Sequence, residues 1–240
     1  LGETIGIGKG TIGLDDLESS ECIFIFGQNP GSNHPRMLAS LQKAKQNGCK
    51  IVSINPLDEA GLQKFNNPQE VSGILGQGTK LRDLHLPINI NGDVAFLTGL
   101  AKYLIQEHEA APTTSPVLDT AFINEYTSGF DAFKKHIIDV EWHTITQACA
   151  LSEKQIVDAG DYLLNSKKTI FCWAMGMTQH KNAVANIQLM VNVLMLQGNL
   201  GKPGAGVCPV RGHSNVQGDR TMGIWENAPL SFIQALSAYH

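Results

Sequence analysis

The 240-residue sequence lacks the features that would connect it to a membrane or to nucleic acid. No uninterrupted apolar run approaches the roughly 18 residues that a membrane span needs, and the first residues carry no signal-peptide pattern. Acidic residues outnumber basic ones by 22 to 18, and no Lys/Arg cluster offers a surface for phosphates. We therefore expect a cytoplasmic protein that neither enters membranes nor binds nucleic acid.

Cysteine is also scarce. The five cysteines are odd in number and widely spaced, and no two of them form a CxxC pair. This pattern argues against a disulfide framework, a zinc site or an iron–sulfur cluster made within this chain, so no metal ligands are assigned. We expect reduced, mostly buried thiols.

The composition that is present is typical of a globular protein. Hydrophobic residues make up 42% and charged residues 17%, far from the charge-rich composition of disordered chains. The length allows one large domain, or one domain with a fragment of another. Because Leu1 is not a methionine and the apolar run before His240 has no stop signal, we expect both ends to be boundaries within a longer protein.

The first half of the sequence predicts a βαβ unit. Residues 22–26 and 50–54 are short apolar runs rich in β-forming residues, and apolar positions recur at helical spacing from Asn33 to a stop signal at Gly48. A helical crossover between two strands implies that the strands are parallel.

The alternation continues along the chain. We expect strands at 84–88 and 168–174 and helices at 93–107 and 178–196. Residues 118–165 are predicted to be mostly helical, in three pieces broken near Gly129 and Val140, the last one starting at Ser152. From Gly198 onward, a glycine-rich stretch predicts a long loop. The fold class that follows is α/β, a doubly wound, mostly parallel sheet with helices on both faces.

The turn after the first strand contains groups suited to an anionic ligand. It lies between a strand and a helix, so backbone N–H groups and the positive helix end would face a pyrophosphate there. The candidate cofactor-binding residues of this turn are Gly27, Gln28, Asn29, Ser32, Asn33 and His34. An ordinary βα turn with an Asn or Ser N-cap is the alternative. The glycines at 6–10 precede the first strand and are interpreted as loop structure.

Polar residues also follow the later strands. Asn55 and Asp58 occupy the place where a doubly wound fold holds a ribose or base. Asp93 opens the next helix, either as a capping residue or as an acceptor for a guanine N–H edge. The turn after the strand at 168–174 faces the same edge and adds four candidates: Met175, Gly176, Met177 and Gln179.

The final glycine loop concentrates Arg, His, Asn and Gln, which favours a functional role over simple chain reversal. Arg211 is a fixed cation that can hold a carboxylate or phosphate through two hydrogen bonds. His213 can donate, accept or transfer a proton. We predict both as catalytic residues, although either residue alone is more often structural.

Five segments, in this order, resemble the dimethyl-sulfoxide-reductase superfamily of molybdopterin oxidoreductases, most closely the catalytic α subunit of its formate dehydrogenase branch. They are FIFGQNPGSNHPRM at 24–37, IVSINPLDEAG at 51–61, GDVAFLTGL at 92–100, WAMGMTQHKNAV at 173–184 and LQGNLGKPGAGVCPVRGHSNVQGDRTMG at 196–223. The match spans most of the chain, and its last segment is the longest and most specific.

The resemblance implies the third of four domains in a catalytic subunit. Residues 1–215 would bind one of two molybdopterin guanine dinucleotides, and residues 216–240 would begin the return to a neighbouring domain. The turn at 27–33 would line the pyrophosphate. Asn55, Asp58 and Asp93 would hold the guanosine end, while the four candidates after the strand at 168–174 would lie along the cofactor.

The resemblance also implies what the intact enzyme contains. We expect molybdenum or tungsten bis(molybdopterin guanine dinucleotide), a metal ligand that precedes this fragment, and a fragment that is inactive alone. The implied partners are the remaining domains of the subunit, a small oxyanion or formate-like substrate and an electron-transfer partner. Arg211 matches the arginine that orients the substrate carboxylate beside molybdenum. His213 stands where formate dehydrogenases usually have Gln, and Asn55 where many members have Asp.

A second hypothesis comes from another class of protein. A stand-alone Rossmann-like nucleotide-binding or regulatory module, without molybdenum, would have an ordinary dinucleotide site. That hypothesis requires a GxGxxG motif directly after a strand, whereas the glycines at 6–10 precede the first predicted strand. A purely structural interaction domain leaves the polar glycine loop unexplained.

Overall fold

The computed structural model describes residues 1–111, 116–213, 215–224 and 228–239. The chain forms two compact units, Leu1–Val210 and Arg211–His240. The first unit contains the central sheet and is described first; the second is described by itself.

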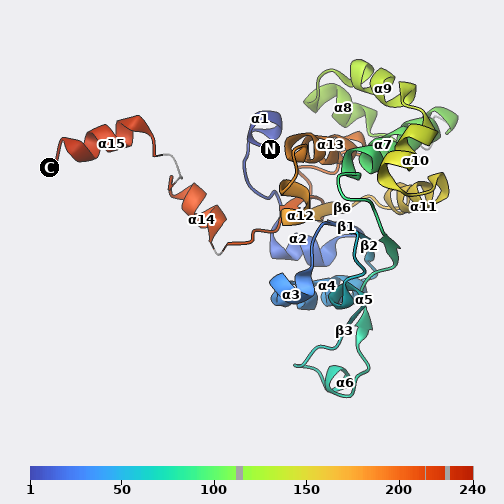
Figure 1. The fold of residues 1–240 in the computed structure, drawn as a ribbon, viewed down its shortest axis with the longest axis horizontal. Coiled ribbons are helices and arrows are strands. Elements are labelled where there is room, and N and C mark those ends of the chain that lie inside the picture. Colours follow the sequence, from blue (N-terminus) through green and yellow to red (C-terminus); the bar gives the residue numbers. More distant parts are fainter. Residues whose placement is uncertain (112–115, 214, 225–227, 240) are drawn as a thin grey trace. The chain divides into compact units, whose positions relative to one another are not determined.

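A five-stranded parallel sheet organises the first unit (Figure 1). Its strands, in spatial order, are β5 (Leu84–Leu86), β2 (Lys50–Ile54), β1 (Cys22–Phe26), β6 (Thr169–Trp173) and β7 (Gly206–Pro209). Cys22 pairs with Lys50 on one side and with Thr169 on the other. The expected doubly wound α/β fold is therefore confirmed.

The pleat of the central strand β1 divides the core into two parts. Phe24 and Phe26 point to the larger core, whereas Ile23 and Ile25 point to the smaller one. The Phe171 ring lies 5.1 Å from the ring of Phe24, between ring centroids, and reinforces the larger core. All five residues of β1 are buried, as expected for a parallel strand that helices cover on both sides.

Helices cover both faces of the sheet (Figure 1). Three helices pack on the smaller core: α2 (Leu14–Ser19), α4 (Pro35–Gln46) and α5 (Ala60–Gln63). The helices longer than one turn on the larger core are α7 (Asp93–Ala110), α8 (Thr120–Tyr126), α9 (Phe130–Asp139), α10 (Trp142–Cys149), α11 (Glu153–Leu164) and α13 (Ala183–Leu196). Among the helices formed by the described residues, none is both long and apolar enough to cross a membrane.

Short elements complete the first unit. Three of them are single helical turns: α1 (Gly2–Ile5), α3 (Pro30–Asn33) and α12 (Met175–Thr178). The others form an arm that extends from the body in Figure 1: β3 (Lys64–Phe65), α6 (Val71–Ile74) and β4 (Thr79–Lys80). The strands β3 and β4 pair with each other in antiparallel fashion and do not join the central sheet.

The second unit contains two helices, α14 (Val216–Thr221) and α15 (Leu230–Ser237). The helix α14 follows Asn215, whose φ is 57° and whose carbonyl oxygen accepts a hydrogen bond from the backbone N–H of Asp219. The helix α15 agrees with the apolar periodicity of its sequence, and its large apolar side chains are exposed within this unit.

Three predicted elements differ from the structure. The stretch from Gly198 was predicted to be a loop, yet it contains β7, which pairs with β6 in parallel register. The composition hid this strand because glycine weakens a local strand signal. Contacts with distant residues also hold it: Thr11 accepts a hydrogen bond from the backbone N–H of Val207, and the backbone N–H of Thr11 donates to the Val207 carbonyl oxygen.

The helical region at 118–165 forms four helices instead of three. Ala150 adopts a left-handed conformation, φ 58°, and ends α10. The Ser152 hydroxyl then accepts from the Gln155 backbone N–H, and the Gln155 side chain accepts from the Ser152 backbone N–H. This capping box starts α11.

The helix predicted from residue 178 starts at Ala183. The short turn α12 precedes it, and the carbonyl of Gly176 in that turn lies 2.5 Å from Nε2 of His180. This contact gives the Gly176 carbonyl a side-chain partner between the short turn and α13.

Candidate functional site

The loops after β1, β2 and β6 lie at the carboxyl edge of the parallel sheet. The chain runs from β1 through α4, on the smaller core, to β2, and it reaches β6 from helices on the larger core. The winding direction therefore reverses between β1 and β6. Ligands of open α/β sheets bind outside such a switch point, which makes these loops the candidate site.

Two glycines bring the loops after β1 and β6 into direct backbone contact. The backbone N–H of Gly176 donates to the carbonyl oxygen of Gly27 over 3.1 Å. A Cβ atom on Gly176 would lie 2.5 Å from that oxygen, and one on Gly27 would lie 2.8 Å from the Gly176 Cα. Gly27 also has a φ of 53°, where side chains are disfavoured. Both positions therefore require glycine.

Gln28 follows this contact and is almost fully buried, with 2% of its surface exposed. Its Nε2 atom lies 3.2 Å from the sulfur of Met37 and 3.4 Å from Nδ1 of His34. Its Oε1 atom has no hydrogen-bond partner among the described residues. A buried amide oxygen without a partner costs free energy, so Gln28 is a candidate for more than a structural role.

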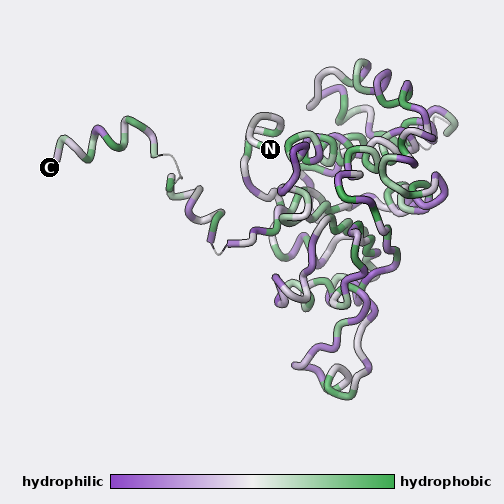
Figure 2. The backbone as a smooth tube through the Cα atoms, in the orientation of Figure 1, coloured by the Kyte–Doolittle hydropathy of each residue, from purple (hydrophilic) through white to green (hydrophobic). Residues whose placement is uncertain are grey.

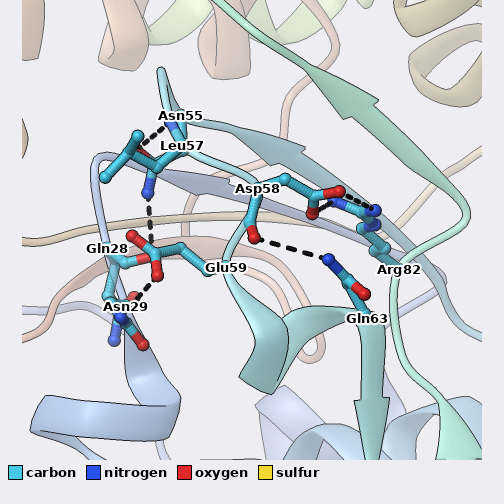
Figure 3. A network of polar contacts seen from close by, with 8 residues as sticks. All are labelled: Gln28, Asn29, Asn55, Leu57, Asp58, Glu59, Gln63 and Arg82. Atoms are coloured by element: carbon cyan, nitrogen blue, oxygen red, sulfur yellow. Dashed lines mark hydrogen bonds and ion pairs between the residues drawn. The ribbon is translucent and has the colours of Figure 1, made fainter.

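The turn after Gln28 is held by side chains on two loops. Oδ1 of Asn29 accepts from the backbone N–H of Ser32, and its Nδ2 donates to the Glu59 carboxylate over 2.5 Å (Figure 3). Gly31 and Gly61 also pack backbone to backbone, since a Cβ on Gly61 would lie 2.7 Å from the Gly31 Cα. These contacts fix the two loops relative to each other.

The remaining candidates in this turn lie on its surface. Ser32 and Asn33 are exposed, and His34 is half-buried. The predicted helix is interrupted here: α3 ends at Asn33 and α4 starts at Pro35. Asn29 acts as the N-cap of α3, so the capping role that the sequence left open is confirmed for this residue.

Asn55 connects the loop after β2 to the loop after β1. Its Nδ2 donates to the carbonyl oxygen of Gln28 over 3.3 Å, and its Oδ1 accepts from the backbone N–H of Leu57 (Figure 3). The side chain is 8% exposed. Both of these hydrogen bonds are structural, and a contact of Asn55 with a ribose or base stays a prediction.

Asp58 is exposed and forms an ion pair with Arg82, which precedes β5 (Figure 3). Nη2 of Arg82 lies 2.8 Å from Oδ2 of Asp58, and Nη1 donates to the other carboxylate oxygen. These hydrogen bonds hold the pKa of the Asp58 carboxyl below its usual range. Contact of Asp58 with a guanosine stays a prediction.

Asp93 lies in the first turn of α7, directly after the N-cap Gly92, and is 6% exposed. Burial raises the pKa of its carboxyl, while the charge of the nearby His180 opposes this shift. The loops around these two residues are also linked, since Nδ2 of Asn182 donates to Oδ1 of Asn91. Asp93 thus lies close to the loop after β6.

The four candidates after β6 divide into two groups. Met175 is 47% exposed, and Gly176 and Gln179 are also exposed at the carboxyl edge. Met177 is fully buried in the larger core. Three of the four can therefore meet a ligand at the surface, whereas Met177 supports the loop from below.

The predicted catalytic residues belong to the second unit. Arg211 is half-buried and His213 is exposed within it. Their approach to the strand ends of the first unit stays a prediction.

Three residues of the site were missed from the sequence. Glu59 and Gly61 fix the turn after β1, and Arg82 pairs with Asp58. The run Asp58-Glu59 was a usable signal, because a second carboxylate followed the predicted strand. Arg82 offered none, since its partner lies 24 residues earlier in the chain.

The assembled groups are suited to binding more than to chemistry. They are amides, backbone groups and carboxylates with internal partners, and no three His, Cys, Asp or Glu side chains of the described residues converge as metal ligands. Such a set can bind and orient a polar ligand.

Comparison with protein families gives a match over nearly the whole chain. The family model described as molybdopterin oxidoreductase matches residues 6–233. An uncharacterized oxidoreductase of Mycobacterium tuberculosis (strain ATCC 25618 / H37Rv) is 48% identical over 98% of this chain and 30% of its own length. Protein YdeP of Escherichia coli (strain K12) is 43% identical over 98% of this chain and 32% of its own length.

More distant relatives extend this result. Formate dehydrogenase H of Escherichia coli (strain K12) is 28% identical over 93% of this chain and 28% of its own length. The solved structure of acetylene hydratase from Pelobacter acetylenicus superposes with a TM-score of 0.64 over 81% of this chain and 25% of that one, at 16% identity, and so shows a shared fold. The chain thus spans about a third of the curated relatives it matches.

Proposed function

Because this chain belongs to the molybdopterin oxidoreductase family, we propose that it is the part of a larger oxidoreductase that holds one of two molybdopterin guanine dinucleotides. The observation that carries this proposal is the family match over residues 6–233, together with the meeting of three polar loops at the switch point. Full enzymes of the family contain molybdenum or tungsten bound by two such dinucleotides, and the metal ligand of this one would lie outside residues 1–240.

The described residues fit such a ligand. The backbone contact between Gly27 and Gly176 keeps side chains away from the point where the loops separate. The unpartnered Oε1 of Gln28 and the buried carboxyl of Asp93 offer acceptors for N–H groups, such as those of a guanine edge. Ser32 and Asn33 add exposed donors beside the turn that would line the pyrophosphate.

The bound cofactor supplies two-electron redox chemistry, and the protein binds and orients it. Asn55 and Asp58 would meet the guanosine end. Met175, Gly176 and Gln179 would lie along the cofactor, and the buried Met177 would support their loop from the core. We assign this binding role to residues 1–215 and a return to a neighbouring domain to residues 216–240. The compact first unit ends slightly earlier, at Val210.

We further propose a formate-like or other small oxyanion substrate, held by the Arg211 guanidinium through two hydrogen bonds. His213 would stand beside it as a second polar group that can exchange a proton. The remaining domains and an electron-transfer partner would complete an enzyme that is inactive as this fragment alone. The cytoplasmic location expected from the sequence is part of the same proposal.

Metal and nucleotide analysis of the full-length protein, made in a host that synthesises the cofactor, tests the assignment. We expect about one molybdenum or tungsten and about two guanine nucleotides per chain after acid hydrolysis. Absence of both would contradict the proposal and favour a nucleotide-binding module without metal.

The substrate is tested separately through Arg211. Formate-dependent reduction of a viologen dye is expected for the parent enzyme, and Arg211→Lys should raise KM for formate roughly tenfold, because lysine cannot form the two parallel hydrogen bonds. Metal content should not change. A loaded parent enzyme that is inactive with formate would reject formate while leaving cofactor binding intact.

A further inference from the structure

The arm formed by residues 64–80 carries an apolar tip that the proposed cofactor role does not explain. We propose that this tip docks onto another part of the same polypeptide, outside residues 1–240. Figure 1 shows α6 at the far end of the arm, and Figure 2 shows apolar residues there, at a distance from both core faces of the sheet.

The amphipathicity of the tip is inverted. In an ordinary surface helix the large apolar residues face the protein. Here Gly73 faces inward, so closely that a Cβ on it would lie 2.0 Å from the carbonyl oxygen of Asn67. Val71, Ile74 and Leu75 face outward, with exposures of 74%, 72% and 69%. The fold thus buries the smallest residue of the turn and exposes the largest ones.

Polar contacts at the base of the arm hold this inverted arrangement in place. Nδ2 of Asn67 donates to Oε1 of Gln42 on α4 over 2.8 Å, and Nε2 of Gln42 donates to Glu70 and to Thr79. The Lys64 ammonium also donates to the carbonyl oxygen of Gly76 over 2.6 Å. Because these contacts order the arm before any partner binds, docking costs little conformational entropy.

The charge of the arm indicates what kind of surface it meets. Between Phe65 and Thr79 the only charged residue is Glu70, whose carboxylate oxygens accept from Gln42 and Asn67. Anionic lipid surfaces and nucleic acids attract clusters of Lys and Arg, which the tip lacks. An apolar centre with a neutral polar rim is typical of protein interfaces.

The size of the tip indicates that its partner is covalently linked. Three exposed side chains offer on the order of 400 Å², about half of the ~800 Å² per partner that a specific complex of separate proteins buries. A contact within one chain does not pay the entropy of bringing two molecules together. Relatives continue for about twice the length of this chain outside the matched region, which supplies the surface.

Cysteine labelling of the full-length protein tests the proposal. In Ile74→Cys, peptide-resolved alkylation by iodoacetamide should be at least about tenfold slower in the native protein than in the same protein unfolded in urea. This protection should not change over a hundredfold dilution. A native rate close to the unfolded rate would overturn the proposal, and protection lost on dilution would assign the tip to a second copy instead.

Stability of the full-length protein gives an independent measurement. Ile74→Ser should lower the Tm by several degrees, because it removes an apolar side chain from an interface. The matched control, Gln77→Ser on the same arm, should leave the Tm unchanged. An unchanged Tm in Ile74→Ser would show that the side chain is exposed to water in the intact protein, contrary to the proposal.

Discussion

The two ends of the central strands use polar residues in different ways. At the amino end, polar side chains bond to the main chain of regular elements: Asp83 accepts from the backbone N–H of Ile51 over 2.8 Å, and Asn199 accepts from that of Thr169. At the carboxyl end, side chains join one loop to another, as in the contact between Asn29 and Glu59.

The difference indicates which end binds a ligand. Buried polar atoms without partners among the described residues occur at both ends, as Oε1 of Gln28 and Nδ2 of Asn199 show, so the distinction rests on the kind of contact. Side chains at the carboxyl end hold loops, whereas those at the amino end fix the strands that give these loops a rigid base. A hollow of about 640 Å³ lies at the amino end, but its lining residue Glu21 accepts from the backbone N–H of Lys167 and so already has a structural role.

The largest loss of stability is expected from a change in the backbone contact between Gly27 and Gly176 at the carboxyl end. Gly176→Ala would place a Cβ 2.5 Å from the Gly27 carbonyl oxygen, and we expect a loss of about 3 kcal/mol in the free energy of unfolding. Urea denaturation of the full-length protein measures it. Gly8→Ala is the control, since nothing lies within 4 Å of that Cβ. Equal stability of both variants would show that the contact can relax.

A smaller loss is expected at the amino end. Oδ2 of Asp83 accepts from the Lys45 ammonium over 2.6 Å in addition to the Ile51 N–H. Asp83→Asn removes this charge, and we expect a loss of about 1.5 kcal/mol in stability with the guanine nucleotide content of the full-length protein unchanged. If Asp83→Asn is stable but has lost its guanine nucleotide, the amino end of the strands also takes part in ligand binding, contrary to the distinction drawn between the two ends.

For the contact between Asn29 and Glu59 we expect the opposite: little loss of stability but a loss of bound nucleotide. In Glu59→Gln the Asn29 amide still has an oxygen acceptor, but this acceptor is no longer charged. The free energy of unfolding should therefore fall by less than about 1 kcal/mol. Retention of guanine nucleotide through gel filtration should fall severalfold, because a neutral acceptor holds the turn after β1 less firmly than the carboxylate does. Glu153→Gln, in the first turn of α11, is the control and should retain the nucleotide.

The elements that the sequence predicted well are those whose signal is local. The strands β1 and β2 match their apolar runs residue for residue, and the loops after them were placed correctly. The strand β7 was missed because its glycine-rich surroundings weaken the local strand signal, so that only the pairing with β6 in the fold reveals it. The ion pair of Asp58 with Arg82 was also missed, since the fold alone brings these residues together.

The smallest expected change concerns Asp93, for which the sequence left two roles open. Burial raises the pKa of its carboxyl, so the native state binds this proton more tightly than the unfolded chain does. Its contribution to stability is therefore complete at acid pH and is lost as the pH rises through the native pKa. At neutral pH the buried carboxylate is a cost, and Asp93→Asn should raise the Tm by a few degrees.

The gain should vanish at acid pH, where the parent carboxyl is protonated as well. Asp131→Asn is the matched control, because Asp131 also lies in the first turn of a helix but is exposed. There the charge favours the helix, and its loss should lower the Tm slightly. The N-cap of α7 is Gly92 and not Asp93, so a lower Tm in Asp93→Asn at neutral pH would mean that the Asp93 charge stabilises the first turn of the helix. If Asp93→Asn raises the Tm and releases guanine nucleotide, the carboxylate is retained at a cost to stability because it binds the ligand.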